Sequence, residues 1–158
     1  MGAGVSALIP ALIADGYRSI DAVDLSDAAL GQLHDALGPD AASVRFIQGD
    51  IRTVTFDVPI DVWHDRATFH FLTSPDDQTT YATNAAMAIR PGGHLVLATF
   101  SPTGPEQCSN MDVARWGSDG LAAHFGVHFV LVDAFEREHR TPWGAPQSFT
   151  HALLRRRS

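Results

Sequence analysis

The sequence predicts an α/β fold, and three features of the chain indicate it. Segments with the apolar spacing of helices alternate with short apolar segments typical of buried strands. A glycine-rich turn at residues 1–6 opens directly into an apolar helix, an arrangement that presents free N–H groups to a ligand. The chain ends on two strand-like segments, 129–136 and 149–154, and the turn between them predicts an antiparallel pair.

The first third of the chain alternates helix and strand. A first helix is expected over residues 6–15, with a broad buried face formed by Val5, Leu8, Ile9, Leu12 and Ile13. Residues 19–24 have the pattern of a strand that ends in the carboxylate of Asp24. Ser26 is expected to cap a second helix, whose predicted inner positions are Ala28, Leu30, Leu33 and Leu37. A third strand is expected at residues 44–47.

The rest of the chain continues the alternation. Residues 60–63 are mostly apolar, as expected of a central strand, and the polar segment 64–72 follows them. A helix is predicted over residues 76–89, with inner positions at Tyr81, Ala85, Met87 and Ala88. Residues 94–100 form the clearest strand of the chain, and a short helix is expected at residues 118–124.

Length and composition limit the class of protein. A chain of 158 residues suggests one domain over its whole length. The formal net charge of −7 favours neither nucleic acid nor an anionic membrane as a partner. Cys108 is the only cysteine, so an intramolecular disulfide is excluded, which fits a reducing compartment. No apolar segment is long enough to span a bilayer and no secretion signal is evident, so the cytoplasm is the expected location.

Four features, in this order, resemble class I S-adenosylmethionine-dependent methyltransferases. They are Gly2-Ala3-Gly4 opening a helix, Asp24 closing the next strand, the turn Gln48-Gly49-Asp50, and the connection Arg90-Pro91-Gly92-Gly93 before a strong strand. The likeness covers nearly the whole chain, and residues 63–72 and 140–143 are similar to a bacterial small-molecule branch. The resemblance implies a Rossmann-like, doubly wound, mostly parallel sheet with a C-terminal antiparallel hairpin. It also implies methyl transfer from S-adenosylmethionine to a small-molecule substrate.

The resemblance further implies a cofactor site, formed by Gly2, Ala3, Gly4, Asp24, Leu25, Asp50 and Ile51. The glycines would let the main chain pass against the methionine and ribose parts of the cofactor. Asp24 would accept hydrogen bonds from the two ribose hydroxyls, one at each carboxylate oxygen. Asp50 would accept from the adenine amino group, with Ile51 against the ring. Simpler explanations are a flexible start for the glycines, a helix cap for Asp24 and an ordinary Gly-Asp turn for Asp50.

The candidate catalytic residues are His64, Asp65, Arg66 and His70. They are expected to follow the fourth strand, where an open α/β sheet places its reaction crevice. His64 or His70 could remove a proton from the methyl acceptor, since the imidazole pKa lies close to neutral pH. Arg66 could hold a carboxylate or another anion. An ion pair between Asp65 and Arg66 that only supports the loop is an equally open explanation.

A metal site is not predicted. His124 and His128 are four residues apart, but Gly126 between them argues against a continuous helix, and there is no cysteine cluster.

The chain also departs from the family pattern. Family members usually carry a strand before the glycine turn, and this first strand is absent from the sequence. Three explanations are open: the chain is a fragment or has a misplaced start, the second strand pairs directly with the fourth, or two chains form a homodimer through the open sheet edges.

The sequence alone leaves two other functions open. One is a truncated, catalytically inactive methyltransferase-like domain. The other is an NAD(P)-binding oxidoreductase, because Gly2-x-Gly4-x-x-Ala7, followed by Asp24, fits the dinucleotide fingerprint.

Overall fold

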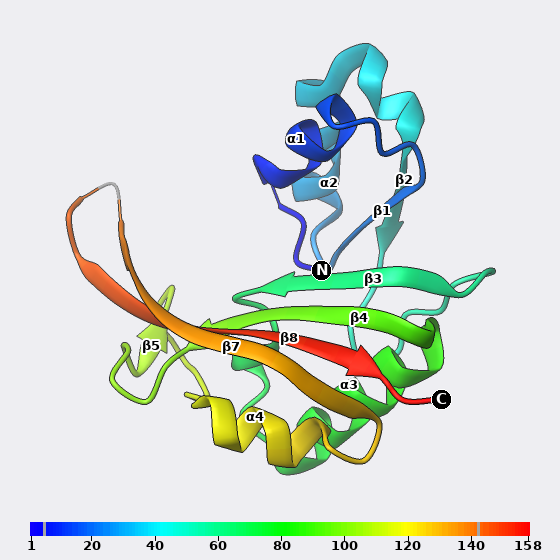
Figure 1. The fold of residues 1–158 in the computed structure, drawn as a ribbon. Coiled ribbons are helices and arrows are strands. Elements are labelled where there is room, and N and C mark those ends of the chain that lie inside the picture. Colours follow the sequence, from blue (N-terminus) through cyan, green and yellow to red (C-terminus); the bar gives the residue numbers. More distant parts are fainter. Residues whose placement is uncertain (5, 142) are drawn as a thin grey trace. The chain divides into compact units, whose positions relative to one another are not determined.

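The computed structural model describes residues 1–158 apart from Val5 and Pro142, and the predicted inward position of Val5 lies outside the described residues. The chain divides into two compact units, Met1–Val54 and Thr55–Ser158 (Figure 1). Each unit contains a sheet with helices of its own. A single domain over residues 1–158 stays a prediction.

The unit Met1–Val54 is built on a two-stranded parallel sheet. Its elements are α1 (Leu8–Ala14), β1 (Ile20–Asp24), α2 (Asp27–Leu37), the 3₁₀ helix η1 (Gly38–Ser43) and β2 (Val44–Gln48). Ile20 of β1 lies opposite Val44 of β2, and Asp24 lies opposite Gln48. Apolar residues of both helices and both strands share one core, so this short unit is held together by packing as well as by the strand pair.

The predicted elements of this unit are confirmed with small shifts at their ends. Ser26 Oγ accepts a hydrogen bond from the Ala29 N–H over 3.2 Å, so it caps α2 as predicted. The predicted inner positions Leu30, Leu33 and Leu37 are buried. Ala28 is exposed, and its predicted inner position was wrong, because two residues before Leu30 is the opposite side of a helix. In α1 only Ile9 and Ile13 are fully buried, so the buried face is narrower than predicted.

The unit Thr55–Ser158 is built on a four-stranded mixed sheet of order β3–β4–β8–β7. Its elements are β3 (Ile60–Arg66), the 3₁₀ helix η2 (Phe69–Phe71), α3 (Pro75–Ala88), β4 (Ile89–Phe100), β5 (Gln107–Cys108), β6 (Met111–Asp112), α4 (Ser118–Phe125), β7 (Phe129–Arg140) and β8 (Pro146–Arg156). β3 and β4 run parallel, whereas β8 runs antiparallel to both β4 and β7. The predicted α/β class and the C-terminal antiparallel hairpin are confirmed.

The two faces of this sheet differ. Helices α3 and α4 lie against one face (Figure 1), where Trp63, Leu95 and Leu154 are fully buried. The alternate side chains of the same strands belong to the opposite face, because successive residues of a strand point to opposite sides. We call this opposite face the open face; it carries His64, Arg66, Val96, Ala98, Phe149, His151, Leu153, Asp133 and Phe135.

Strand β3 is longer than predicted. His64, Asp65 and Arg66 pair with Val96, Leu97 and Ala98 of β4, so these three candidate residues lie within the strand and not after it. The prediction that they follow the fourth strand was therefore wrong. The pairing with β4 satisfies their backbone groups, which favours the extended conformation despite three polar side chains.

Helix α3 packs as predicted through Tyr81 and Ala85, both fully buried. Met87 is 79% exposed, and its predicted inner position was wrong. Residues 90–93 were predicted to connect this helix to a strand at 94–100, but they belong to β4 itself, which begins at Ile89. A Cβ at Gly93 would come within 2.8 Å of the Asp61 carbonyl oxygen, which explains the glycine at this place in the strand. In the described part of the chain, no helix has the length and apolar character needed to cross a membrane.

Candidate functional site

The glycine turn meets the end of β1 within the unit Met1–Val54. Gly2 and Gly4 have φ angles of 58° and 44°, in the left-handed region that favours glycine. The Gly4 N–H donates to Oδ2 of Asp24 over 2.9 Å, and the Ala3 N–H donates to the Val23 carbonyl oxygen over 3.0 Å. The structure thus brings together the turn and the carboxylate that the family resemblance placed in one site.

The Asp24 carboxylate is held by backbone groups on both sides. Its Oδ1 accepts a hydrogen bond from the Ser26 N–H over 2.9 Å, while Oδ2 accepts from Gly4. A carboxylate oxygen has about two lone-pair sites, so each oxygen can still accept one hydroxyl hydrogen. The side chain is half-buried, and its neighbour Leu25 is 68% exposed. A fixed, partly exposed carboxylate with one free site on each oxygen fits a cis-diol.

Asp50 and Ile51 fit their expected roles less directly. Asp50 already accepts hydrogen bonds from the Arg52 backbone N–H over 2.8 Å and from the Arg52 Nε over 3.0 Å. The hydrogen bonds with the Arg52 side chain lower the pKa of Asp50. Ile51 is 6% exposed, so its side chain offers little surface to an adenine ring. Binding of an adenine here would share the Asp50 carboxylate with Arg52, and the roles of both residues stay predictions.

Asp65 lies at the centre of a buried hydrogen-bond network on the helix-covered side of the sheet. Its Oδ1 accepts from the N–H groups of Thr68 and Phe69, over 3.0 and 3.2 Å, and its Oδ2 accepts from the Tyr81 hydroxyl over 2.8 Å. The Trp63 Nε1–H in turn donates to the Tyr81 oxygen over 3.1 Å. Burial raises the pKa of Asp65, and the hydrogen bonds oppose that shift. These contacts indicate that Asp65 positions the turn after β3.

Asp65 lies on the opposite face of the sheet from two other candidate catalytic residues, His64 and Arg66. Asp65 is fully buried, whereas His64 and Arg66 belong to the open face. Neighbouring residues of one strand point to opposite sides, so the ion pair of Asp65 with Arg66 considered from the sequence is not formed. A catalytic role for Asp65 stays a prediction without a contact that supports it.

His70 lies in η2 and is fully buried. Its ring centroid is 4.6 Å from that of Phe71 and 4.8 Å from that of Phe100. Neither ring nitrogen has a hydrogen-bond partner among the described residues. Burial lowers the pKa of His70 to about 4, so the ring is neutral at pH 7. Its enclosed position makes it a poorer candidate base than His64.

Substituting His70 with phenylalanine should remove part of the acid sensitivity of the fold. The pKa of His70 is 6.5 in the unfolded chain and about 4 in the folded one, so the unfolded state binds more protons between these values. Stability is therefore lost as the pH falls from 6.5 to 4, by about 3 kcal/mol in total. Denaturant unfolding of wild type and His70→Phe across this range measures the difference. Parallel pH profiles would contradict it.

His64 and Arg66 lie on the open face, one pleat apart on β3. Burial lowers the pKa of His64, and the charge of Arg66 adds to this shift, so His64 is neutral at pH 7 and able to accept a proton. The Arg66 guanidinium carbon lies 5.4 Å from the ring centroid of Phe149, within the range of a cation–π contact. No ion pair of Arg66 occurs among the residues that the structure describes, so its charge can meet a ligand's anion.

Three aromatic residues of this face were missed in the sequence. Phe149 and His151 lie on β8, and Phe135 lies opposite His151 on β7. The Phe135 and His151 rings stack at 4.8 Å between centroids and 9° between planes. The alternation Phe149, His151, Leu153 is visible in the sequence and predicts one shared face. The sequence does not show which strand lies beside β8 on each side.

Residues 1–93, more than half of the chain, match a family model described as a methyltransferase domain. The chain belongs to this family. The family predicted from the glycine turn, Asp24 and the later turns is thereby confirmed. No curated protein matches the chain.

Many solved structures share the fold. An S-adenosylmethionine-dependent methyltransferase from Methanosarcina mazei has a TM-score of 0.80 at 14% identity, covering 99% of this chain and 90% of that one. A 1,6-didemethyltoxoflavin-N1-methyltransferase from Burkholderia thailandensis, solved with 1,6-didemethyltoxoflavin and S-adenosylhomocysteine, has a TM-score of 0.77 at 21% identity, covering 99% and 69%. The N-methyltransferase NodS from Bradyrhizobium japonicum, solved with S-adenosylhomocysteine, has a TM-score of 0.77 at 15% identity, covering 99% and 76%. These likenesses confirm the predicted Rossmann-like methyltransferase fold.

Proposed function

We propose that this methyltransferase domain transfers a methyl group from S-adenosylmethionine to a small-molecule acceptor. The observation that carries the proposal is the Asp24 carboxylate, held by the N–H groups of Gly4 and Ser26 and still able to accept two hydroxyl hydrogens. The S-adenosylhomocysteine bound in the structures from Burkholderia thailandensis and Bradyrhizobium japonicum supports the choice of donor.

The unit Met1–Val54 would bind the donor. Asp24 would accept hydrogen bonds from the two ribose hydroxyls, and Gly2 and Gly4 would let the main chain lie close to the methionine part. The exposed Leu25, directly after Asp24, would pack against the nucleoside. When bound, S-adenosylmethionine supplies a methyl group on a positively charged sulfur.

The unit Thr55–Ser158 would handle the acceptor. The neutral ring of His64 would take the proton that a hydroxyl or amino group of the acceptor loses as it is methylated. Arg66, on the same face, would hold an anionic group of the acceptor. The 1,6-didemethyltoxoflavin in the structure from Burkholderia thailandensis supports a small molecule as acceptor.

Calorimetric titration of the whole chain with S-adenosylmethionine, S-adenosylhomocysteine and NAD tests the proposal. We expect the first two to bind and NAD to give no heat above dilution. Binding of NAD alone would instead support a nucleotide-dependent oxidoreductase. The absence of binding with all three ligands would support an inactive domain and overturn the proposal.

Self-association through open strand edges and a cytoplasmic location also stay predictions. Self-association is motivated by the strand edges that a two-stranded sheet such as β1–β2 leaves unpaired.

A further inference from the structure

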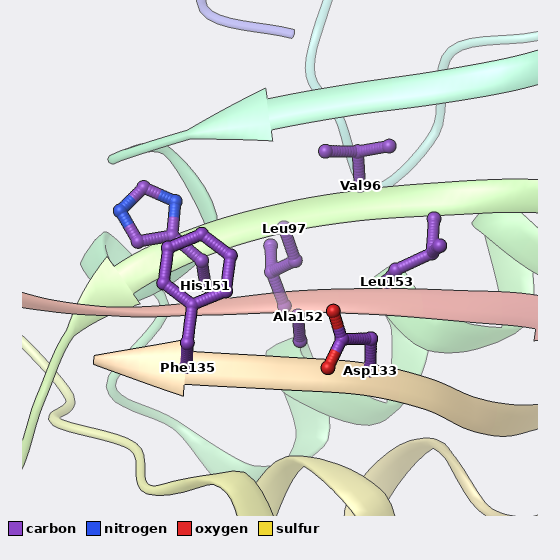
Figure 2. Close-up of a pocket in the computed structure, with 7 residues that line it drawn as sticks. All are labelled: Val96, Leu97, Asp133, Phe135, His151, Ala152 and Leu153. Atoms are coloured by element: carbon purple, nitrogen blue, oxygen red, sulfur yellow. The ribbon is translucent and has the colours of Figure 1, made fainter. Parts of the chain in front are cut away.

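The open face carries a pocket of about 120 Å³ within the unit Thr55–Ser158. Figure 2 shows its side chains, and those that shape it are Val96, Asp133, Phe135, His151 and Leu153. They come from β4, β8 and β7, three adjacent strands of one sheet. We propose that this pocket binds the methyl acceptor, and that the acceptor is a single aromatic ring with a hydrogen-bond donor at each end. This inference rests on the proposed function.

The size and lining of the pocket fit one ring. A cavity of roughly 150 Å³ lined by apolar side chains is known to hold benzene, and this pocket is slightly smaller and open to solvent. The stacked rings of Phe135 and His151 form one side, while Val96 and Leu153 lie opposite them (Figure 2). Phe135 is 54% exposed, although a large aromatic side chain usually gains by burial. A flat ligand would cover it.

One end of the pocket accepts hydrogen bonds only. Asp133 lies beside Leu153 in the strand register and lines the pocket with its carboxylate (Figure 2). No ion pair or hydrogen bond of this carboxylate is found among the described residues. Asp133 is exposed, so its carboxylate stands at the solvent edge of an otherwise apolar pocket. There it can accept a hydrogen bond from a hydroxyl or amino donor and would anchor one end of the ring.

The other end of the pocket lies toward the candidate base. His64 is opposite Val96, Val96 is opposite Leu153, and Leu153 is opposite Asp133, so the four residues form one row across the open face. Neighbouring strands are about 4.8 Å apart, so His64 is the next side chain beyond Val96. A ring seated over Val96 and Leu153 would have one donor at Asp133 and its other end toward His64. The group that reacts is the one that gives its proton to His64.

An NMR titration of the whole chain tests this assignment without any cofactor. The probe is 4-hydroxybenzyl alcohol, which has a donor at each end of one ring, and the imidazole C–H signals of His64 and His151 report binding. We expect saturable shifts of both signals, while the signals of His128, outside the pocket, stay unchanged. The saturated analogue 4-(hydroxymethyl)cyclohexanol should bind about fivefold more weakly, since it cannot stack.

Two variants test the individual contacts of the pocket with the probe, and a third serves as their control. Phe135→Leu keeps an apolar side chain but loses the ring, and should weaken binding of 4-hydroxybenzyl alcohol about fivefold. Asp133→Ala should weaken it about tenfold, because the anchoring acceptor is lost. Val132→Ala removes an exposed apolar side chain of the same strand that does not line the pocket, and should leave the affinity unchanged.

The result that overturns the inference is an unshifted His151 signal, or equal affinities for the aromatic probe and its saturated analogue. Because the titration contains no S-adenosylmethionine, its failure differs from failure of the proposed function. Donor binding with no probe binding would remove only the acceptor assignment. Probe binding without donor binding would retain the aromatic site and remove methyl transfer.

Discussion

Replacing Asp65 with alanine is expected to lower the free energy of unfolding by about 3–5 kcal/mol. The carboxylate is fully buried and accepts hydrogen bonds from the Tyr81 hydroxyl and the N–H groups of Thr68 and Phe69. The Tyr81 hydroxyl and the Phe69 N–H would be left buried without this partner, at a cost of about 1–3 kcal/mol each, and the part-buried Thr68 N–H would lose its bond to Asp65. The cost is partly offset because no carboxylate is buried any longer. Denaturant unfolding followed by tryptophan fluorescence, to which the buried Trp63 beside Tyr81 contributes, measures the loss.

Asp61→Ala is the matched control on the same strand. The Asp61 side chain is 75% exposed and pairs with Arg90 at the surface, so its loss should cost less than about 1 kcal/mol. Tyr81→Phe should fall between the two variants, because it leaves one Asp65 oxygen and the Trp63 N–H without a partner. If Asp65→Ala were no more destabilising than Asp61→Ala, Asp65 would not hold the turn.

Local patterns were sufficient to predict most elements of the fold. Ser26 before an apolar periodic segment marks a helix start whatever surrounds it, and the 3.6-residue period identified Leu30 and Leu33 as inner positions. The end of β3 was different. The polar residues His64 to Arg66 indicated that the strand had ended, but pairing with β4 continues it. The length of β3 depends on its partner strand β4, which lies about thirty residues further along the chain. A local sequence pattern carries no information about such a partner.

The candidate site was predicted unevenly for a related reason. Gly4 and Asp24 were placed in one site through the resemblance to the methyltransferase family, and the hydrogen bond between them confirms that they lie together. Asp65 was grouped with His64 and Arg66 because they are adjacent in sequence, although the two-residue period of a strand already puts it on the other face. The stack of Phe135 on His151 depends on the register of the C-terminal hairpin, and register cannot be derived from either strand alone.

Replacing Asp24 with alanine should weaken binding of S-adenosylhomocysteine by about 2–4 kcal/mol, on the order of 30- to 1,000-fold. Two losses add in this variant. The ribose hydroxyls lose a charged acceptor, and the Gly4 N–H loses the oxygen that holds it over 2.9 Å, so the glycine turn is no longer fixed. Ser26 also loses a hydrogen bond at the start of α2. Calorimetric titration of wild type and variant measures the change.

Two further variants identify the cause of this loss. Asp24→Asn keeps one carbonyl oxygen, so it can still accept from Gly4 or from one hydroxyl, and its loss of affinity should be smaller than that of Asp24→Ala. Asp21→Asn removes a carboxylate from the same strand whose partner is Arg45 at the surface, and it should bind as wild type does. Circular dichroism establishes that each variant is folded. An affinity unchanged in folded Asp24→Ala would remove Asp24 from the site, and the glycine turn would then have to bind the donor without it.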